Sequence, residues 1–321
     1  MVTRMEIAVT GASGLVGSAL TPALAAAGHR VRRVVRRHPA LNRAPVRPSG
    51  QPATHPDEVG WNASTGYFET AGLEGAEAVV HLAGENIATG RWTAAKKAAI
   101  RASRVEGTRQ LCEALAGLPR PPRTLICASA VGYYGDRAQE RLTEASAPGQ
   151  GFLAEVGQVW EAAAEPARRR GIRVVHLRCG MILTLRDGAL AKMLLPFRLG
   201  VGGVIGNGTQ YWSWIALDDV VGVVQHALRE MTLRGPVNTV APQVLTNREF
   251  TKTLGRVLGR PTVCPVPGWA ARLAFGEMAD ALLLASTRVE PVQLLATSYP
   301  YRWPELEGAL RHLLARESSH A

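Results

Sequence analysis

The stretch TGASGLVG, residues 10–17, places a glycine at every third position, at Gly11, Gly14 and Gly17. An apolar, partly β-branched run precedes it, and a run rich in Leu and Ala follows it. These flanking compositions predict a strand, a tight turn and a helix, in that order. Such a loop exposes the backbone amides of a helix N-terminus, which is a favourable place for an anion.

Each of the three glycines has an expected task. Gly11 permits the turn out of the strand, Gly14 allows backbone to approach a pyrophosphate, and Gly17 allows the helix to pack closely on the sheet. The spacing is G-x-x-G-x-x-G and follows the first strand of a βα series, which favours dinucleotide binding. The alternative is a glycine-rich turn that holds no ligand.

Strand-like and helix-like segments alternate over the first part of the chain. The predicted strands are residues 5–10, 30–35, 78–83, 124–129 and 173–178, and the predicted helices are residues 15–27, 92–117 and 152–170. This alternation predicts an α/β fold with a Rossmann-type, doubly wound parallel sheet. Ligands bind such sheets at the carboxyl ends of the strands, where we expect the functional residues.

The pattern changes after residue 180, and the C-terminal part reads as mostly helical. We therefore expect a smaller, mostly helical substrate lobe. The predicted division gives residues 1–183 to a nucleotide-binding domain, completed by 217–241, and gives 184–216 and 242–321 to the substrate lobe.

Composition narrows the class of protein. The chain has 321 residues, is 46% hydrophobic and contains no apolar run that approaches the ~20 residues of a membrane span. We expect a soluble cytoplasmic protein without a membrane partner. The formal net charge of +11 comes mainly from arginines spread along the chain, and without a reading motif this spread argues against nucleic-acid binding.

Four cysteines lie far apart in the sequence, at Cys112, Cys127, Cys179 and Cys264. None forms a C-x-x-C pair or has a histidine at metal-ligand spacing. We predict neither a disulfide nor a metal site.

Arg36 and Arg37 stand about 20 residues after the glycine loop, where a fold that prefers NAD places an acidic residue. A carboxylate there would repel a 2′-phosphate, whereas guanidinium groups bind it with paired hydrogen bonds. NADP(H) is therefore the predicted cofactor. The alternative is that both residues belong to the general arginine excess.

Several further motifs occur in order along nearly the whole chain: AVVHLAGEN, SRVEGTRQLCEAL, SAVGYYGD, LLPFRLGVGG, SWIALDD and TNREF. Together with the glycine loop, the sequence resembles the extended short-chain dehydrogenase/reductase superfamily. Within it, the chain is similar to an epimerase-like family of proposed NADP-dependent oxidoreductases.

The resemblance implies roles for individual residues. Ser13, Leu15 and Val16 would flank the pyrophosphate, and Arg36 and Arg37 would meet the adenosine phosphate. Leu82, Ala83 and Gly84 would line the adenine or ribose pocket, and Arg104 would reach the cofactor from its helix. Met181 and Ile182 would lie near the nicotinamide. Leu82, Ala83 and Ile182 could equally be ordinary core residues.

Members of this superfamily that transfer hydride usually carry Tyr-x-x-x-Lys on one helix, and the lysine lowers the pKa of the tyrosine. No lysine in this chain has a tyrosine four residues before it. The corresponding positions fall at Phe152 or Leu153 and at Val156 or Gly157, none of which titrates. This departure weakens the case for catalysis and leaves the case for cofactor binding intact.

Ser129 with Tyr133 or Tyr134 provides a substitute pair in SAVGYYGD. Ser129 would donate a hydrogen bond to a substrate carbonyl, and one phenol would supply the proton. A phenol without a lysine partner donates a proton more easily than it accepts one, which favours reduction. The alternative is that both tyrosines only pack the loop.

Asn86, which follows a strand, and Trp212 are the predicted substrate contacts, with core packing as the alternative for Trp212. The sequence thus predicts an NADP(H)-dependent oxidoreductase that reduces a small carbonyl substrate of unknown identity. A non-catalytic NADP(H) sensor or scaffold is the alternative. Relatives of this branch often pair through helices that flank the sheet, so a homodimer is compatible with the resemblance.

Overall fold

The computed structural model describes residues 4–36, 57–62 and 65–318. The chain forms two compact units. Unit 1 contains Met1–Glu85, Ala99–Ala128 and Trp160–Val175, and unit 2 contains Asn86–Ala98, Ser129–Val159 and His176–Ala321.

Eight strands form the main sheet in the order β11-β8-β6-β5-β1-β2-β3-β4. Their bounds are β1 (Glu6–Thr10), β2 (Arg30–Arg36), β3 (Glu58–Asn62), β4 (Tyr67–Phe68), β5 (Ala78–His81), β6 (Thr124–Ala130), β8 (Arg173–Cys179) and β11 (Gly235–Thr239). The pairs β1–β2, β1–β5, β2–β3 and β5–β6 are parallel, and β4 runs antiparallel to β3.

The five strands predicted from the sequence are present, with ends that differ by at most two residues. In β1, Ile7, Ala8 and Val9 are fully buried, as expected of a central strand covered on both faces. Three strands of the sheet were not predicted, namely β3, β4 and β11. They are short or contain Gly or Pro, so they lack a clear apolar run.

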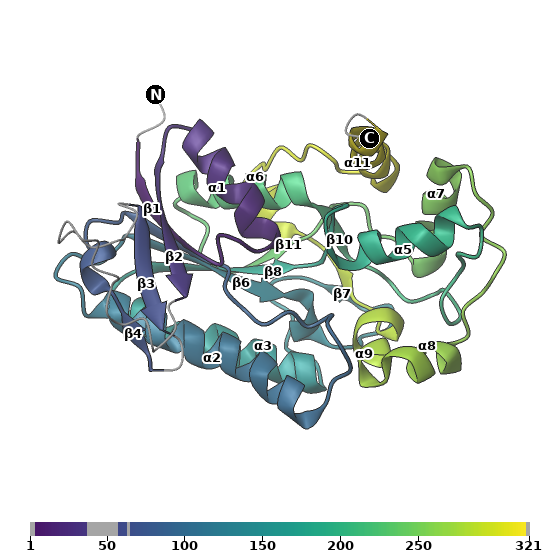
Figure 1. The fold of residues 1–321 in the computed structure, drawn as a ribbon, viewed down its shortest axis with the longest axis horizontal. Helices are drawn as coiled ribbons and strands as arrows, with labels where there is room; N and C mark the ends of the chain where they lie inside the picture. Colours follow the sequence, from purple (N-terminus) through teal and green to yellow (C-terminus); the bar gives the residue numbers. More distant parts are fainter. Residues whose placement is uncertain (1–3, 37–56, 63–64, 319–321) are drawn as a thin grey trace, which may run out of the picture. The chain divides into compact units, whose positions relative to one another are not determined.

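Helices cover both faces of the sheet in unit 1. Figure 1 shows α1 (Leu15–Ala26) and α2 (Ala94–Ala116) on opposite sides of the strands β1, β2 and β3. On the α2 side, Leu111 and Leu115 belong to a buried cluster with Val34, Val59 and other residues of the sheet. The third predicted helix is divided into α3 (Phe152–Ala162) and α4 (Glu165–Arg169), with Pro166 in the first turn of α4. Proline at that position is tolerated because the first helical amides have no intrahelical partner.

Unit 2 is mostly helical, as predicted for the C-terminal part. Its helices are α5 (Gly188–Arg198), α6 (Leu217–Arg229), α7 (Asn247–Leu258), α8 (Gly268–Phe275), α9 (Glu277–Ala279), α10 (Val292–Ala296) and α11 (Leu306–Ser318), with shorter helical turns η3 (Val131–Tyr134) and η4 (Asp280–Leu284). Two parallel pairs of short strands complete the unit: β9 (Met181–Leu183) with β10 (Trp214–Ala216), and β7 (Arg141–Leu142) with β12 (Arg288–Val289).

The carboxylate of Asp219 organises part of unit 2. It is fully buried near the start of α6 and accepts hydrogen bonds from the Arg302 amide (2.8 Å), the Trp303 amide (3.0 Å) and the Tyr299 hydroxyl (3.1 Å). These bonds fix the segment that leads into α11.

A search of the described helices for one that is both long and apolar enough to traverse a bilayer finds none. The predicted domain boundaries remain a prediction.

Candidate functional site

The glycine loop has no room for side chains at two of its three glycines. Gly11 has φ +65°, and a Cβ there would lie 2.8 Å from the Ala83 amide nitrogen. At Gly17 a Cβ would lie 2.1 Å from the Gly11 carbonyl oxygen. Gly11 therefore serves both the left-handed turn and the close approach to the segment after β5, and Gly17 lets α1 pack on the loop backbone.

The N-terminus of α1 is suited to an anion. Gly14 is the N-cap residue and provides no side-chain cap, and the first turn, which includes Leu15 and Val16, contains no acidic residue. Ser13 precedes the cap and is exposed. The first amides of a helix carry partial positive charge, so this end of α1 favours a phosphate.

A buried hydrogen-bond chain joins the ends of β1 and β5 to α2. Thr10 Oγ1 accepts hydrogen bonds from the Leu82 amide (3.1 Å) and the Ala83 amide (3.2 Å), and it lies 2.7 Å from His81 Nδ1. His81 Nε2 lies 3.1 Å from Thr108 Oγ1. The chain thereby holds the loop residues and the Leu82–Ala83 backbone together.

The donors and acceptors in this chain determine the tautomer of His81. Because Thr10 Oγ1 already accepts two amide hydrogens, its own hydrogen is donated to His81 Nδ1. The ring proton therefore resides on Nε2 and is donated to Thr108. Complete burial lowers the pKa of His81 to about 4, so the imidazole is neutral.

The guanidinium group of Arg104 lies beside Gly84. Its Nη1 donates to the carbonyl oxygens of Glu85 (3.0 Å) and Ile100 (3.3 Å), and its guanidinium lies 5.0 Å from the ring centre of Trp160. Burial lowers the pKa of Arg104 to about 10, opposed by the charge of Glu85, so the group stays cationic at neutral pH. A fixed cation next to Leu82, Ala83 and Gly84 suits an anionic ligand.

Arg36 ends β2, opposite Trp61 of β3 in the register of the sheet, and its guanidinium lies 5.9 Å from the Trp61 ring centre. The arginine is exposed and the indole is buried. The carboxyl end of β2 therefore presents a cation, as expected for binding a 2′-phosphate. Arg37 lies outside the described residues.

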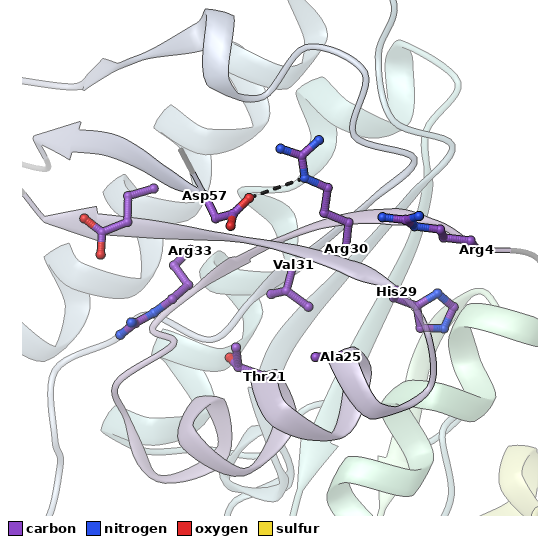
Figure 2. A pocket seen from close by; sticks show the side chains of 9 residues that line it. Arg4, Thr21, Ala25, His29, Arg30, Val31, Arg33 and Asp57 are labelled. Atoms are coloured by element: carbon purple, nitrogen blue, oxygen red, sulfur yellow. Dashed lines mark hydrogen bonds and ion pairs between the residues drawn. The ribbon is translucent and has the colours of Figure 1, made fainter. Parts of the chain in front are cut away.

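A cavity of about 530 Å³ occurs elsewhere in unit 1 and includes none of the predicted cofactor residues. It lies at the start of β2 and includes Arg30, Val31 and His29, with Thr21 and Ala25 of α1. Figure 2 shows Arg30 facing Asp57, with which it forms an ion pair of 3.3 Å. Because this cavity is at the amino end of β2, we do not assign the cofactor to it.

The two candidate tyrosines in unit 2 have different surroundings. Tyr134 is fully buried, its hydroxyl oxygen lies 2.6 Å from Asn238 Oδ1, and it accepts a hydrogen bond from Arg178 (2.9 Å). Burial raises its pKa, opposed by the Arg178 charge. Tyr133 is partly exposed. Of the two phenols, Tyr133 is the one that solvent reaches.

Arg178 was not singled out from the sequence, although it holds both tyrosines. Its guanidinium carbon lies 3.6 Å from the ring centre of Tyr133 and 5.1 Å from that of Tyr134, and its side chain is 3% exposed. A buried cation over an aromatic face is favourable. The available signal was a second arginine, next to the last residue of the strand RVVHLRC.

The helix α3, where the Tyr-x-x-x-Lys pair was sought in the sequence, packs directly on the tyrosine segment. A Cβ on Gly132 would lie 3.1 Å from Leu153 Cβ, and one on Gly157 would lie 3.2 Å from Tyr133 Cα. Leu153 and Gly157 are therefore the pair, four residues apart on α3, that faces residues 132–133. The absence of a side chain at Gly157 leaves room for Tyr133.

Ser129 and Asn86 differ in accessibility. Ser129 is 4% exposed near the end of β6. Asn86 is exposed, and its Oδ1 accepts a hydrogen bond from the Ala88 amide (2.8 Å), which closes a local turn. The Asn86 side-chain oxygen is thus already used to shape the loop.

Met181 and Ile182 are partly exposed on β9, whereas Trp212 is 6% exposed. The Trp212 ring packs on Phe250, and its Nε1 donates to the Leu283 carbonyl oxygen (3.2 Å). The core alternative left open for Trp212 therefore fits the structure better than a substrate contact.

The described residues contain no group of three or more His, Cys, Asp or Glu side chains that could hold a metal ion. All four cysteines are free thiols, with Cys112 and Cys127 buried, Cys179 partly buried and Cys264 exposed.

Comparisons with known proteins identify the family. Residues 7–238 match the NAD dependent epimerase/dehydratase family, and residues 266–313 match a domain of unknown function. An epimerase family protein of Mycobacterium tuberculosis is 41% identical over 310 residues, covering 97% of this chain and 98% of the relative.

Two solved structures are also similar. The human epimerase family protein SDR39U1, crystallised with NADPH, is 35% identical, with a TM-score of 0.84 over 97% of this chain and 99% of that chain. A nucleoside-diphosphate sugar epimerase from Corynebacterium glutamicum is 36% identical, with a TM-score of 0.74 over 98% of this chain and 59% of that chain. The predicted Rossmann-type fold is thereby confirmed, and the chain belongs to the NAD dependent epimerase/dehydratase family.

Proposed function

We propose that this protein is an NADP(H)-dependent oxidoreductase that reduces a small carbonyl compound. The observation that carries the proposal is the pairing of a glycine loop with an uncapped helix N-terminus and a cation, Arg36, at the end of the next strand. The NADPH in the crystals of the human relative supports the choice of cofactor.

Cofactor binding is assigned to residues whose surroundings fit a phosphorylated dinucleotide. The amides of Ser13 in the loop and of Leu15 and Val16 in the first turn of α1 hold the pyrophosphate, and Gly11 and Gly17 keep the loop free of side chains. The segment Leu82–Ala83–Gly84, with Arg104 beside it, lines the ribose and adenine region. Arg36 binds the 2′-phosphate, together with Arg37 in the predicted scheme. Met181 and Ile182 remain the predicted contacts of the nicotinamide.

The chemistry requires one hydride and one proton. When bound, the reduced nicotinamide supplies a hydride to the carbonyl carbon of the substrate. Ser129 donates a hydrogen bond to the carbonyl oxygen, and Tyr133 gives its phenolic proton to the same oxygen, so that an alcohol and NADP⁺ are the products. Arg178 holds the Tyr133 ring by stacking on it at 3.6 Å. Solvent then returns the proton to Tyr133, which is partly exposed.

The decisive experiment follows the loss of nicotinamide absorbance when the protein, NADPH and a panel of aldehydes, ketones and oxo acids are mixed. We expect turnover with at least one class and its loss in Tyr133→Phe. Tight NADPH binding without turnover on any carbonyl would favour the alternative, a sensor or scaffold. The lack of a Tyr-x-x-x-Lys pair, with Phe152 or Leu153 and Val156 or Gly157 at the expected positions, is the observation behind that alternative.

The cytoplasmic location and a homodimeric assembly are also proposals. Sedimentation of the purified protein tests the assembly, and fractionation of the source cells tests the location.

A further inference from the structure

Two of the four lysines in the chain reach the same turn of unit 2. The turn spans residues 86–89 of the segment that follows β5. Lys192 Nζ, on α5, donates to the Ala88 carbonyl oxygen (2.8 Å), and Lys96 Nζ, on α2, donates to Thr89 Oγ1 (2.8 Å). Because Ala88 and Thr89 are consecutive, with Cα atoms about 3.8 Å apart, both ammonium groups lie against one turn.

The surroundings of this turn carry an excess of positive charge. Residues 86–98 contain three basic residues and α5 contains two, and neither segment contains Asp or Glu. The carboxylate of Glu277 is engaged by Lys97, whose Nζ lies 2.8 Å from Oε2 and 3.0 Å from Oε1. Asp187, the N-cap residue of α5, accepts a hydrogen bond from the Gly188 amide. Five basic residues thus stand against two nearby carboxylates, each of which already has a hydrogen-bond partner.

Lys192 has donors left for a ligand. Its side chain is exposed, and it forms no ion pair with any residue that the structure describes. An ammonium group has three donors, of which the Ala88 carbonyl oxygen takes one. An anion bound there would gain charge-assisted hydrogen bonds from Lys192 without breaking an ion pair. Lys96 adds a second positive charge at the next residue of the turn.

Packed contacts connect the turn to the candidate catalytic tyrosine. Trp92 donates from Nε1 to the Ile87 carbonyl oxygen (2.8 Å), and its ring centre lies 5.3 Å from that of Phe152 at the start of α3. The same helix packs on Tyr133 at Gly157. The turn and Tyr133 are therefore both packed against α3.

The turn is also connected to the strand of the predicted nicotinamide contacts. Lys192 lies on α5, which packs on β9 through a buried cluster that contains Leu190 and Leu183. Met181 and Ile182, the predicted nicotinamide contacts, belong to β9. The turn itself follows the carboxyl end of β5, the end of a parallel strand at which ligands bind. The two lysines therefore belong to the part of unit 2 in which the substrate is expected.

We propose that the substrate is an anionic carbonyl compound and that Lys192, together with Lys96, binds its carboxylate or phosphate group. The proposal rests on the reduction proposed above and names the class of compound that is reduced. A lysine ammonium is a compact point charge on a flexible stem, so it binds either anion without a fixed geometry. The positive charge at the turn favours anionic substrates over neutral ones of the same size.

Steady-state reduction of two matched aldehyde pairs by NADPH tests the proposal. Succinic semialdehyde is compared with its methyl ester, and glyceraldehyde 3-phosphate with glyceraldehyde. We expect kcat/KM to be at least tenfold higher for a charged member than for its neutral partner, and to fall as salt is raised. Lys192→Gln should raise the KM of the charged aldehyde at least tenfold with little change in kcat, and Lys192→Arg should keep most of the preference. A lysine that only holds the turn would change the charged and neutral aldehydes alike.

A binding measurement separates this inference from the proposed reduction, because it needs no turnover. Succinate and inorganic phosphate are titrated in a calorimeter into the full-length protein saturated with NADP⁺. At least one anion should bind to the wild type, and Lys192→Gln should weaken its binding at least tenfold. Lys252→Gln is the matched control and should bind like the wild type, since Lys252 on α7 similarly donates to a threonine hydroxyl, that of Thr262 (2.9 Å). Near-ultraviolet circular dichroism verifies that each variant is folded.

The outcomes distinguish the two proposals. The inference is overturned if neither anion binds, or if Lys192→Gln and Lys252→Gln weaken binding equally. It is also overturned if the neutral aldehydes are reduced as efficiently as the charged ones, a result that would leave the proposed reduction standing. Anion binding that depends on Lys192, without reduction of any carbonyl, would overturn the proposed reduction and still support the anion site.

Discussion

His81 Nδ1 lies 2.7 Å from Thr10 Oγ1, and this contact joins the strand that leads into the glycine loop to the strand that leads into Leu82–Gly84. Both strands end at the edge where the cofactor is proposed to bind. The Thr10 hydroxyl oxygen already accepts hydrogen bonds from two amides, so it donates its own hydrogen to His81 Nδ1. Nδ1 therefore carries no proton, and the imidazole is neutral.

The neutral state of His81 makes the free energy of unfolding depend on pH. The folded pKa is about 4, below the ordinary value of 6.5, so the unfolded chain binds more protons between these values. The full contribution of the neutral His81 to the free energy of unfolding is present above about pH 6.5. This contribution falls as the pH approaches 4, by about 3 kcal/mol at most. Urea unfolding of the wild type and His81→Gln at several pH values measures this. The difference between the two proteins should shrink on acidification, and a constant difference would show that His81 does not titrate as described.

Alanine at Gly11 should damage cofactor binding more than alanine at Gly28. Both glycines have positive φ, +65° and +87°, so each substitution carries a left-handed backbone penalty of about 1–2 kcal/mol. Only at Gly11 would the new Cβ also meet backbone, 2.8 Å from the Ala83 amide nitrogen, whereas nothing lies within 4 Å at Gly28.

Fluorescence titration with NADPH is the appropriate measurement for this pair. Gly11→Ala should weaken binding at least tenfold, and Gly28→Ala should leave it near the wild-type value. Equal binding by both variants would argue against the assignment of the loop.

Removing the hydroxyl group of Tyr134 should affect stability, whereas removing that of Tyr133 should affect turnover. Tyr134→Phe deletes a buried hydroxyl that accepts from Arg178 and contacts Asn238, which should lower the free energy of unfolding by about 1–3 kcal/mol. Tyr133→Phe should change stability little and abolish turnover. Denaturant unfolding and the carbonyl assay together separate the roles, and the reverse pattern would exchange the two assignments.

Thiol reactivity should distinguish the cysteines. Burial raises the pKa of Cys112 and of Cys179 to about 12, and raises that of Cys127 as well, so these thiols stay protonated and unreactive near neutral pH. Cys264 is exposed. A disulfide-exchange reagent should modify one thiol rapidly in the native protein and four in denaturant. Rapid modification of a second thiol in the native protein would contradict the buried environments.

The main features of the fold could be predicted because buried parallel strands and the glycine loop have strong local signals. The run Ile7–Val9 is entirely apolar, and Gly11 has a φ of +65°, a conformation that favours glycine. Strands such as β4, with two residues, or β11, which begins with Gly and Pro, depend on pairing with distant residues and leave little local trace.

The surroundings of the candidate catalytic residues were less predictable because they depend on long-range contacts. Tyr133 and Tyr134 are adjacent in sequence, and only the fold shows that Tyr134 is enclosed by Arg178 and Asn238. Trp212 illustrates the same limit, since an alternating tryptophan is equally typical of a cleft and of a core. Cofactor residues were easier to name because the resemblance relates them to motifs in a fixed order.

Isothermal titration calorimetry with NADPH and with NADH tests the central claim, that the loop at residues 11–17 with Arg36 binds NADP(H). The account predicts heat from both, with NADPH at least tenfold tighter, because only NADPH carries the 2′-phosphate. Arg36→Ala should remove most of that preference, and Arg33→Ala, an exposed arginine on the same strand, should retain it. Absence of heat with either dinucleotide, or equal affinities that Arg36→Ala leaves unchanged, would contradict the account.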